Sequence, residues 1–201
     1  MSKITKRVGL IFGSFNPIHN GHLKLAEVCI QNDLVDEVRF VVAAQNPFKD
    51  KYELSFDERY YLVQAATYDH PLKDKFGIYA IENALHDKST YNVLRELKII
   101  NSQRIDNINE DYFIICGDDM YFDIPRWKNG DKLLDENKFI IFNRIQTKYL
   151  SNSNVVAQIA DIMDISSHEI RDMIKADKDI AEYVPTYVKM LIQEKKYYIK
   201  I

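Results

Sequence analysis

Residues 11–22 read IFGSFNPIHNGH and stand between a short apolar run at 8–12 and a segment with helical spacing at 22–31. A strand, a turn and a helix in this order are typical of an open α/β sheet, in which ligands bind at the carboxyl ends of the strands. The turn contains neither the GxGxxG of a dinucleotide fold nor the GxxxxGK[ST] of a phosphate-cradling loop. The stretch therefore predicts a ligand-binding turn of another kind at the edge of a sheet.

Two histidines, His19 and His22, are the chemically distinctive residues of this turn. A helix N-terminus favours anions, because its first N–H groups are unpaired and its dipole is positive there. Two imidazoles at such a place suit a polyphosphate. The same pair can also cap a turn without binding a ligand, and a zinc site would need a further His or Cys cluster that the sequence does not supply.

The rest of the chain alternates apolar runs with amphipathic segments. We predict strands at 38–44, 77–81, 112–116 and 139–142, and helices at 56–67, 90–100, 168–176 and 185–195. Ser55 with Glu58 three residues later is a capping box, and Pro185 suits the first turn of the last helix. This pattern indicates a parallel sheet covered by helices on both faces. The polar stretches 101–111 and 146–154 read as surface loops, so we expect one domain over residues 1–201.

Composition limits the kinds of partner. The 201 residues are 46% hydrophobic, with mixed charges and a formal net charge of −3, so we expect neither nucleic acid nor a membrane surface as partner. Cys29 and Cys116 lie far apart within apolar stretches, which predicts buried thiols rather than a disulfide. The run at 8–12 is too short for a signal peptide, and no segment approaches the roughly 18 apolar residues of a membrane span. We therefore expect a cytoplasmic protein.

The 11–22 stretch closely resembles the first signature of the HxGH nucleotidyltransferase superfamily, G-[GT]-[ST]-F-[DN]-P-x-H-x-G-H. The resemblance implies a Rossmann-like sheet and gives His19 and His22 the role of binding the phosphates of ATP. The second histidine of that signature also stabilises charge at the reacting centre. Further ATP contacts implied by the motif come from Gly13, Ser14, Phe15 and Gly21. Gly13 would allow close backbone approach, and Gly21 a sharp entry into the helix.

A second signature follows near the C-terminus. Residues 165–171 read ISSHEIR and resemble the superfamily's I-S-S-T-x-I-R, with His168 where threonine is usual. The resemblance implies ATP contacts from Ser166, Ser167 and Arg171. Taken alone, two serines before a helix are an ordinary cap. Together the signatures predict an ATP triphosphate between two helix starts, with His22 and Arg171 at one shared edge of the sheet.

Three shorter matches resemble the nicotinate or nicotinamide mononucleotide adenylyltransferases. NPFK at 46–49 resembles that branch's P-P-H-K, FDER at 56–59 its F-x-x-R, and CGDD at 116–119 followed by Trp127 its G-x-D…W. The 90–94 stretch is only loosely similar to S-Y-T-x-D-T-L, with Asn92 in place of Asp. The resemblance implies ATP contacts from Gly117 and Asp119, and mononucleotide contacts from Asn16, Lys49, Thr90, Trp127 and Arg144.

Each of these residues also has a purely structural interpretation. Trp127 offers a flat face to a pyridine ring, and it can equally anchor a loop in the core. Asp119 can accept from ribose hydroxyls or cap a helix. Lys49 can meet a phosphate or belong to a solvated turn, while Arg59 and Arg144 can be surface charges.

The resemblance implies attack by the phosphate of nicotinate mononucleotide on the α-phosphorus of ATP, giving deamido-NAD and pyrophosphate. A phosphomonoester has a second pKa of about 6, so no general base is needed. Mg²⁺ is expected through ATP oxygens and water, without a protein metal site. The alternatives are nicotinamide mononucleotide as acceptor, a phosphopantetheine adenylyltransferase, a cytidylyltransferase and a non-catalytic nucleotide-binding module. The oligomeric state, a homo-oligomer included, stays open.

Overall fold

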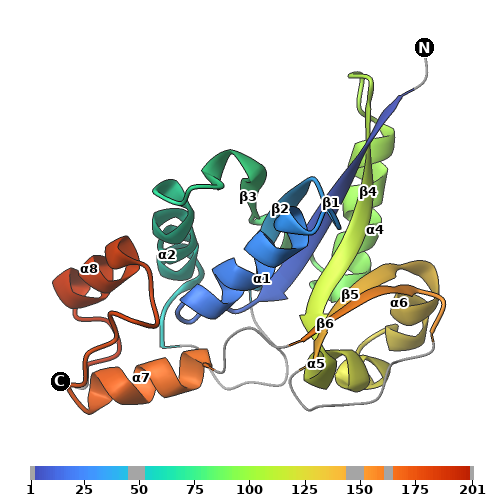
Figure 1. The fold of residues 1–201 in the computed structure, drawn as a ribbon. Helices are drawn as coiled ribbons and strands as arrows, with labels where there is room; N and C mark the ends of the chain where they lie inside the picture. Colours follow the sequence, from blue (N-terminus) through green and yellow to red (C-terminus); the bar gives the residue numbers. More distant parts are fainter. Residues whose placement is uncertain (1–2, 45–52, 144–151, 161–164, 200–201) are drawn as a thin grey trace.

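The computed structural model describes residues 3–44, 53–143, 152–160 and 165–199. Within these residues six strands form one parallel sheet in the order β3-β2-β1-β4-β5-β6 (Figure 1). The strands are β1 (Ile4–Gly13), β2 (Glu37–Val42), β3 (Phe76–Tyr79), β4 (Ile108–Gly117), β5 (Lys138–Asn143) and β6 (Val155–Ala160). The predicted α/β class with a parallel, Rossmann-like sheet is confirmed.

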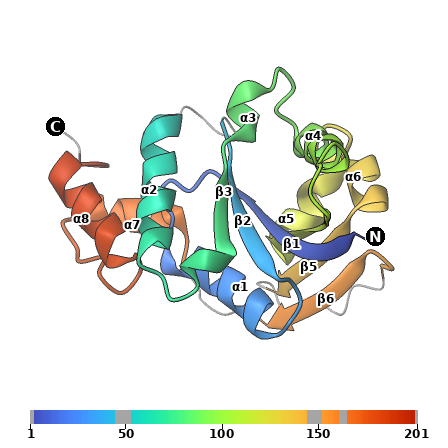
Figure 2. The ribbon, with the colours of Figure 1, turned by 90° about the horizontal axis from the view of Figure 1, so that it is seen from above.

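Helices cover both faces of the sheet, as Figure 2 shows from above. One face carries α1 (Asn20–Gln31), α2 (Phe56–Tyr68), α7 (Ser167–Lys175) and α8 (Thr186–Lys195). The other carries α4 (Thr90–Ser102), α5 (Asp118–Asp123) and α6 (Gly130–Glu136). Shorter pieces are α3 (Ile81–Ala84) after β3, and the 3₁₀ turns η1 (Lys73–Lys75) and η2 (Ile124–Arg126).

The sheet divides the apolar core into two clusters, because successive side chains of a strand point to opposite faces. Phe40 and Phe142 lie in the cluster under α1, α2, α7 and α8. Leu10 and Ile141 lie in the cluster under α4, α5 and α6. Central strands are buried on both faces, which is why their sequences are continuous apolar runs.

The structure departs from the sequence prediction mainly at the ends of elements. The predicted loop at 101–111 is shorter, since α4 continues to Ser102 and β4 begins at Ile108. Strand β6 was not predicted; it is an edge strand of sequence VVAQIA, in which Gln158 interrupts the apolar residues and every residue is half-buried or exposed. Pro185 is the N-cap residue just before α8 rather than part of its first turn. Of the predicted loop at 146–154, only residues 152–154 are among those described.

Several local predictions are confirmed. Ser55 caps α2, with its side chain accepting from the backbone N–H of Glu58. Cys29 and Cys116 are free and buried, and burial raises the pKa of the Cys29 thiol to about 12. Among the described residues we find no helix that combines the length and the apolar character needed to cross a membrane. The prediction of a single domain stays a prediction.

Candidate active site

The turn after β1 is held by the aromatic ring of Phe15. Phe15 has a φ of 47° and is 1% exposed, with its ring meeting Phe40 and His22 edge to face at centroid distances of 5.8 and 5.0 Å. A side chain at Gly13 would meet the same ring at 3.0 Å. The Phe15 side chain therefore belongs to the core, and only its main chain can meet a ligand at this edge of the sheet.

The two histidines stand together at the start of α1. His19 is the N-cap residue, and its backbone N–H donates to Nδ1 of His22 at 3.3 Å. The imidazole centroids are 3.7 Å apart, with 34° between the rings. Since a neutral ring that accepts at Nδ1 carries its proton on Nε2, this contact makes Nε2 of His22 the donor. His19 is 2% exposed, while His22 is half-buried.

Gly21 serves this arrangement through space rather than through backbone freedom. None of the glycines among the described residues has a positive φ, so the sharp entry expected at Gly21 is not what requires it. A Cβ there would lie 2.9 Å from Nδ1 of His19. The glycine thus leaves room for the buried imidazole beside the helix start.

The second signature docks on the first. The Ser167 hydroxyl donates to the carbonyl of Pro17 at 2.8 Å, and Nη1 of Arg171 donates to the carbonyl of Asn16 at 2.8 Å. Ile165, just before α7, and Ile170 within it belong to the same apolar cluster as α1. The predicted meeting of the two helix starts is confirmed (Figure 1).

The side chains of α7 are largely occupied by these structural contacts. Ser166 caps the helix and exchanges hydrogen bonds with Glu169 in a capping box. Hydrogen bonds from the Ser166 hydroxyl and backbone N–H hold the pKa of the Glu169 carboxyl below its usual range. Nε of Arg171 also lies 3.4 Å from Oε1 of Glu53. A ligand at this helix start would therefore meet mainly its first backbone N–H groups and the guanidinium of Arg171.

Among the cations of the site that the structure describes, Arg59 is the most deeply buried, at 1% exposure. Its Nη1 donates to the carbonyls of Ser14 and Ala43, both at 2.7 Å, and its Nη2 to that of Ala44 at 3.2 Å. One guanidinium thus ties the end of β1 to the end of β2. The interpretation of Arg59 as a surface charge is wrong.

The end of β4 carries the next candidate residues. Gly117 is the N-cap of α5, Asp118 is fully buried, and the N–H of Asp119 donates to Oδ1 of Asp118 at 2.9 Å. Asp119 is exposed and is the second residue of the helix, so it is not the cap. The cap interpretation of Asp119 is wrong. Its side chain is exposed at the carboxyl edge, the edge of the sheet formed by the carboxyl ends of the parallel strands.

Trp127 and Thr90 lie on the α4 side of the sheet. Trp127 is half-buried against the cluster under α4, α5 and α6, and its Nε1 lies 3.4 Å from Oδ2 of Asp123. Thr90 is the first residue of α4, after the cap Ser89. An ion pair of 3.0 Å between Asp87 and Lys128 joins these two segments. The Lys128 ammonium lowers the pKa of Asp87 to about 2.

Two predicted positions, Lys49 and Arg144, lie outside the described residues. A third, Asn16, is described and is 4% exposed, and its Oδ1 accepts from the Tyr198 hydroxyl at 2.9 Å. No group of three or more His, Cys, Asp or Glu side chains suited to a metal ion occurs in the described part of the chain.

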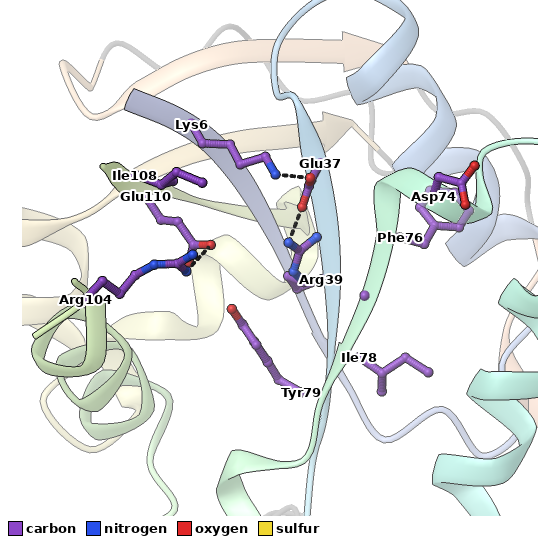
Figure 3. A pocket seen from close by; sticks show the side chains of 11 residues that line it. Lys6, Glu37, Arg39, Asp74, Phe76, Ile78, Tyr79, Arg104, Ile108 and Glu110 are labelled. Carbon is purple, nitrogen blue, oxygen red and sulfur yellow. Dashed lines mark hydrogen bonds and ion pairs between the residues drawn. The ribbon is translucent and has the colours of Figure 1, made fainter. Parts of the chain in front are cut away.

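A pocket of about 510 Å³ lies away from these residues, over the amino halves of the strands (Figure 3). Most of its charged side chains form ion pairs with one another: Lys6 and Arg39 both reach Glu37. Arg104 lies 2.9 Å from Glu110, which also accepts from the Tyr112 hydroxyl at 2.7 Å. We assign this pocket a structural ion-pair network and place the candidate site at the opposite, carboxyl edge.

Sequence reasoning missed two polar contacts of the site. Glu82 is 4% exposed and accepts from the N–H of Ala44 at 2.9 Å. Tyr198 is 5% exposed and holds Asn16. Each partner is distant in sequence, so no local pattern announces the contact. For Arg59, the match of residues 56–59 to F-x-x-R was the available signal.

Comparisons with known proteins find relatives over almost the whole chain. A family model described as cytidylyltransferase-like matches residues 10–173. The probable nicotinate-nucleotide adenylyltransferase of Cytophaga hutchinsonii is 33% identical over 196 residues, covering 96% of this chain and 98% of the relative. That of Bacteroides fragilis is 34% identical over 194 residues, covering 94% and 92%.

Solved structures show the same fold. Plasmodium falciparum nicotinic acid mononucleotide adenylyltransferase complexed with NaAD superposes with a TM-score of 0.79 at 21% identity, covering 96% of this chain and 97% of that one. The same enzyme complexed with APC gives a TM-score of 0.76 at 21% identity with the same coverage.

Proposed function

We propose, from the premise that this chain belongs to the cytidylyltransferase-like family and to its nicotinate-nucleotide adenylyltransferases, that it joins ATP to nicotinate mononucleotide. The products are deamido-NAD and pyrophosphate. Curated relatives that are 33% and 34% identical over almost the whole chain make it a nucleotidyltransferase of NAD biosynthesis.

One observation carries the proposal within the structure: the second signature is docked on the main chain of the first. Ser167 and Arg171 bind the carbonyls of Pro17 and Asn16, which brings the starts of α1 and α7 together. Two helix N-termini, two imidazoles and a guanidinium at one place form a strong anion site. We assign the triphosphate of ATP to this place.

Catalysis at this site consists of positioning and charge neutralisation. The acceptor phosphate has a second pKa of about 6, so it attacks as a dianion at neutral pH without a general base. Nε2 of His22, made a donor by the contact at Nδ1, donates to an oxygen of the α-phosphate as negative charge builds there. The His19 ring lies against the His22 ring at a tilt of 34° and keeps it in place. Arg171 neutralises the leaving pyrophosphate.

The acceptor lies, in this proposal, on the α4 side of the carboxyl edge. The segments that carry Trp127 and Thr90 are joined there by the Asp87–Lys128 ion pair. The exposed face of Trp127 stacks on the pyridine ring, and Thr90 offers a hydroxyl at the start of α4. Lys49 and Arg144 are proposed to contact the mononucleotide on the family resemblance alone. Asp119, exposed at the start of α5, is proposed to accept from the adenosine ribose.

We propose Mg²⁺ as the metal that accompanies ATP. Among the described residues, Asp118 and Asp119 at the end of β4 belong to no group of three or more His, Cys, Asp or Glu side chains suited to a metal ion, and Asp118 is fully buried. An ion held by phosphate oxygens and water needs no protein cage, and it neutralises the charge of the triphosphate. The buried, free thiols fit action in the reducing cytoplasm, which we propose as the location.

The test is pyrophosphate release from ATP and Mg²⁺ with three acceptors: nicotinate mononucleotide, nicotinamide mononucleotide and phosphopantetheine. We expect the largest kcat/KM with nicotinate mononucleotide. A larger value with phosphopantetheine, or no pyrophosphate with any acceptor, contradicts the proposal. Omission of Mg²⁺ and addition of chelator should abolish turnover, and turnover that persists there contradicts the metal assignment.

A further inference from the structure

Two buried charged side chains hydrogen-bond to one short segment of main chain at the end of β2. Glu82 of α3 accepts from the N–H of Ala44 at 2.9 Å. Arg59 of α2 donates to the carbonyls of Ala43 at 2.7 Å and Ala44 at 3.2 Å. Glu82 is 4% and Arg59 1% exposed. The peptide that leaves β2 is therefore held on both its donor and its acceptor sides by charged groups.

An ionised Glu82 side chain at this buried position lowers the stability of the folded state. Burial raises its pKa to about 7, against the opposing effects of the Ala44 N–H, Lys88 and Arg59. The folded pKa exceeds the ordinary 4.5, so the folded state binds more protons between these values. Stability then falls as pH rises from about 4.5 to about 7. The negative charge of Glu82 therefore lowers stability at neutral pH, and a stabilising role does not account for a carboxylate at this position.

Glu82 lies on the face of the sheet to which the proposed function assigns the acceptor mononucleotide. Its neighbours Ile81 and Leu85 pack, partly buried, against the same apolar cluster as Trp127 and Tyr91. Ile165 and Ile170, which flank the ATP side, belong to the opposite cluster. Glu82 thus lies at the exits of β2 and β3, on the face that the proposed function gives to the mononucleotide.

We propose that Glu82 is a positioning residue for the mononucleotide: its carboxylate fixes the Ala43–Ala44 peptide at the carboxyl edge, and so shapes the acceptor side of the active site. The inference rests on the proposed function. A charge-assisted hydrogen bond is about twice as strong as a neutral one, so the ionised form holds this peptide more firmly. Neither signature of the sequence contains this residue.

The experiment compares wild type with Glu82→Gln, which keeps the size and an oxygen acceptor but has no charge. At pH 8 we expect KM for nicotinate mononucleotide to rise about fivefold, because a charged hydrogen bond becomes neutral. KM for ATP should stay within about twofold of wild type. The ratio of the two acceptor KM values should fall towards one below pH 6, where wild-type Glu82 is itself protonated. Titration of the substrate phosphate cancels in this ratio.

Thermal unfolding at pH 8 separates positioning from a structural role. Glu82→Gln should unfold at the same temperature as wild type or higher, since it removes a buried charge. Glu82→Ala, which removes the acceptor altogether, should raise the acceptor KM by about tenfold or more. Glu96→Gln, at a half-buried α4 residue that pairs with Arg95, should change neither KM.

The outcomes are distinguishable. An inactive wild type contradicts the proposed function, whereas an active wild type with an unchanged acceptor KM in Glu82→Gln contradicts only the role of Glu82. Equal rises in both KM values, a KM ratio that does not vary with pH, or a lower unfolding temperature for Glu82→Gln would also overturn it.

Discussion

At the scale of single residues, most polar side chains of the site hold main chain. Ser167, Arg171 and Arg59 all donate to carbonyls of the loops that follow β1 and β2. His22 is different, because it is half-buried and accepts at Nδ1 from the backbone, which directs its remaining proton to Nε2. The chemistry is therefore concentrated on one ring that its neighbours orient.

Replacing His22 with alanine tests that concentration. We expect kcat to fall by about 10²–10³, the usual cost of losing one preorganised donor, while circular dichroism and unfolding stay close to wild type. His70→Ala is the control: its imidazole pairs with Glu27 at 3.0 Å, at the end of α2, and kcat should stay within about twofold. A soluble His22→Ala protein with near-normal turnover removes His22 from the mechanism.

Replacing Arg59 with methionine tests the guanidinium that joins β1 to β2. Buried carbonyls lose a charged donor, and Glu82 loses a nearby positive charge, so the free energy of unfolding in urea should fall by about 3 kcal/mol. Arg95→Met, at an α4 position where the side chain is 59% exposed, should change it by less than about 0.5 kcal/mol. If both variants lose the same small amount, the buried contacts of Arg59 do not stabilise the fold.

At the scale of elements, α7 shows how a helix start can serve structure and binding together. Its two serines have different partners: Ser166 caps the helix through Glu169, and Ser167 fastens it to Pro17. Ser166→Ala should lower the free energy of unfolding by about 1 kcal/mol, the usual value of a cap, and leave KM for ATP nearly unchanged. Ser167→Ala should raise KM for ATP about fivefold, because the helix loses a hydrogen bond that docks it on the first signature.

Steady-state kinetics and urea unfolding of both serine variants distinguish these roles. The opposite pattern, with the larger rise in KM for Ser166→Ala, would mean that the Ser166 hydroxyl leaves its cap to meet the ligand.

Elements with strong local patterns were predictable, and others were not. The central strands are apolar on both faces and α2 has its capping box, so sequence alone located them. Strand β6 is half-exposed at an edge, and α3 and α5 are too short to show a helical period. Their positions depend on tertiary packing more than on a local pattern.

The site was predictable to the extent that it consists of consecutive residues. Both signatures were identified, because each is a run at one helix start. Glu82 and Tyr198 were not, because the first meets Ala44 and the second meets Asn16 only in the folded chain. For Phe15 and Ser166 the sequence located the residue, but the side chain turned out to be occupied by packing or by the cap.

At the scale of the whole molecule, the end of the chain supports the first catalytic turn. The hydroxyl of Tyr198 donates to Oδ1 of Asn16, 182 positions away. Just before α8, the carbonyls of Tyr183 and Glu182 accept from the backbone and side chain of Asn20 at 2.7 and 2.9 Å. The region after α7 therefore holds both ends of the turn that carries His19.

Replacing Tyr198 with phenylalanine isolates this long-range contact. Tyr198 has a φ of 66°, but phenylalanine meets the same backbone constraint, so only the hydroxyl is lost. A buried acceptor without its donor should lower the free energy of unfolding by about 1 kcal/mol, and a less firmly held turn should lower kcat/KM about threefold. Tyr187→Phe, at an α8 position that is 42% exposed, should change neither quantity. If Tyr198→Phe lowers stability while kcat/KM stays unchanged, the Tyr198 hydroxyl only stabilises the fold, and the geometry of the turn is kept by its other contacts, those with α7 and with residues 182–183.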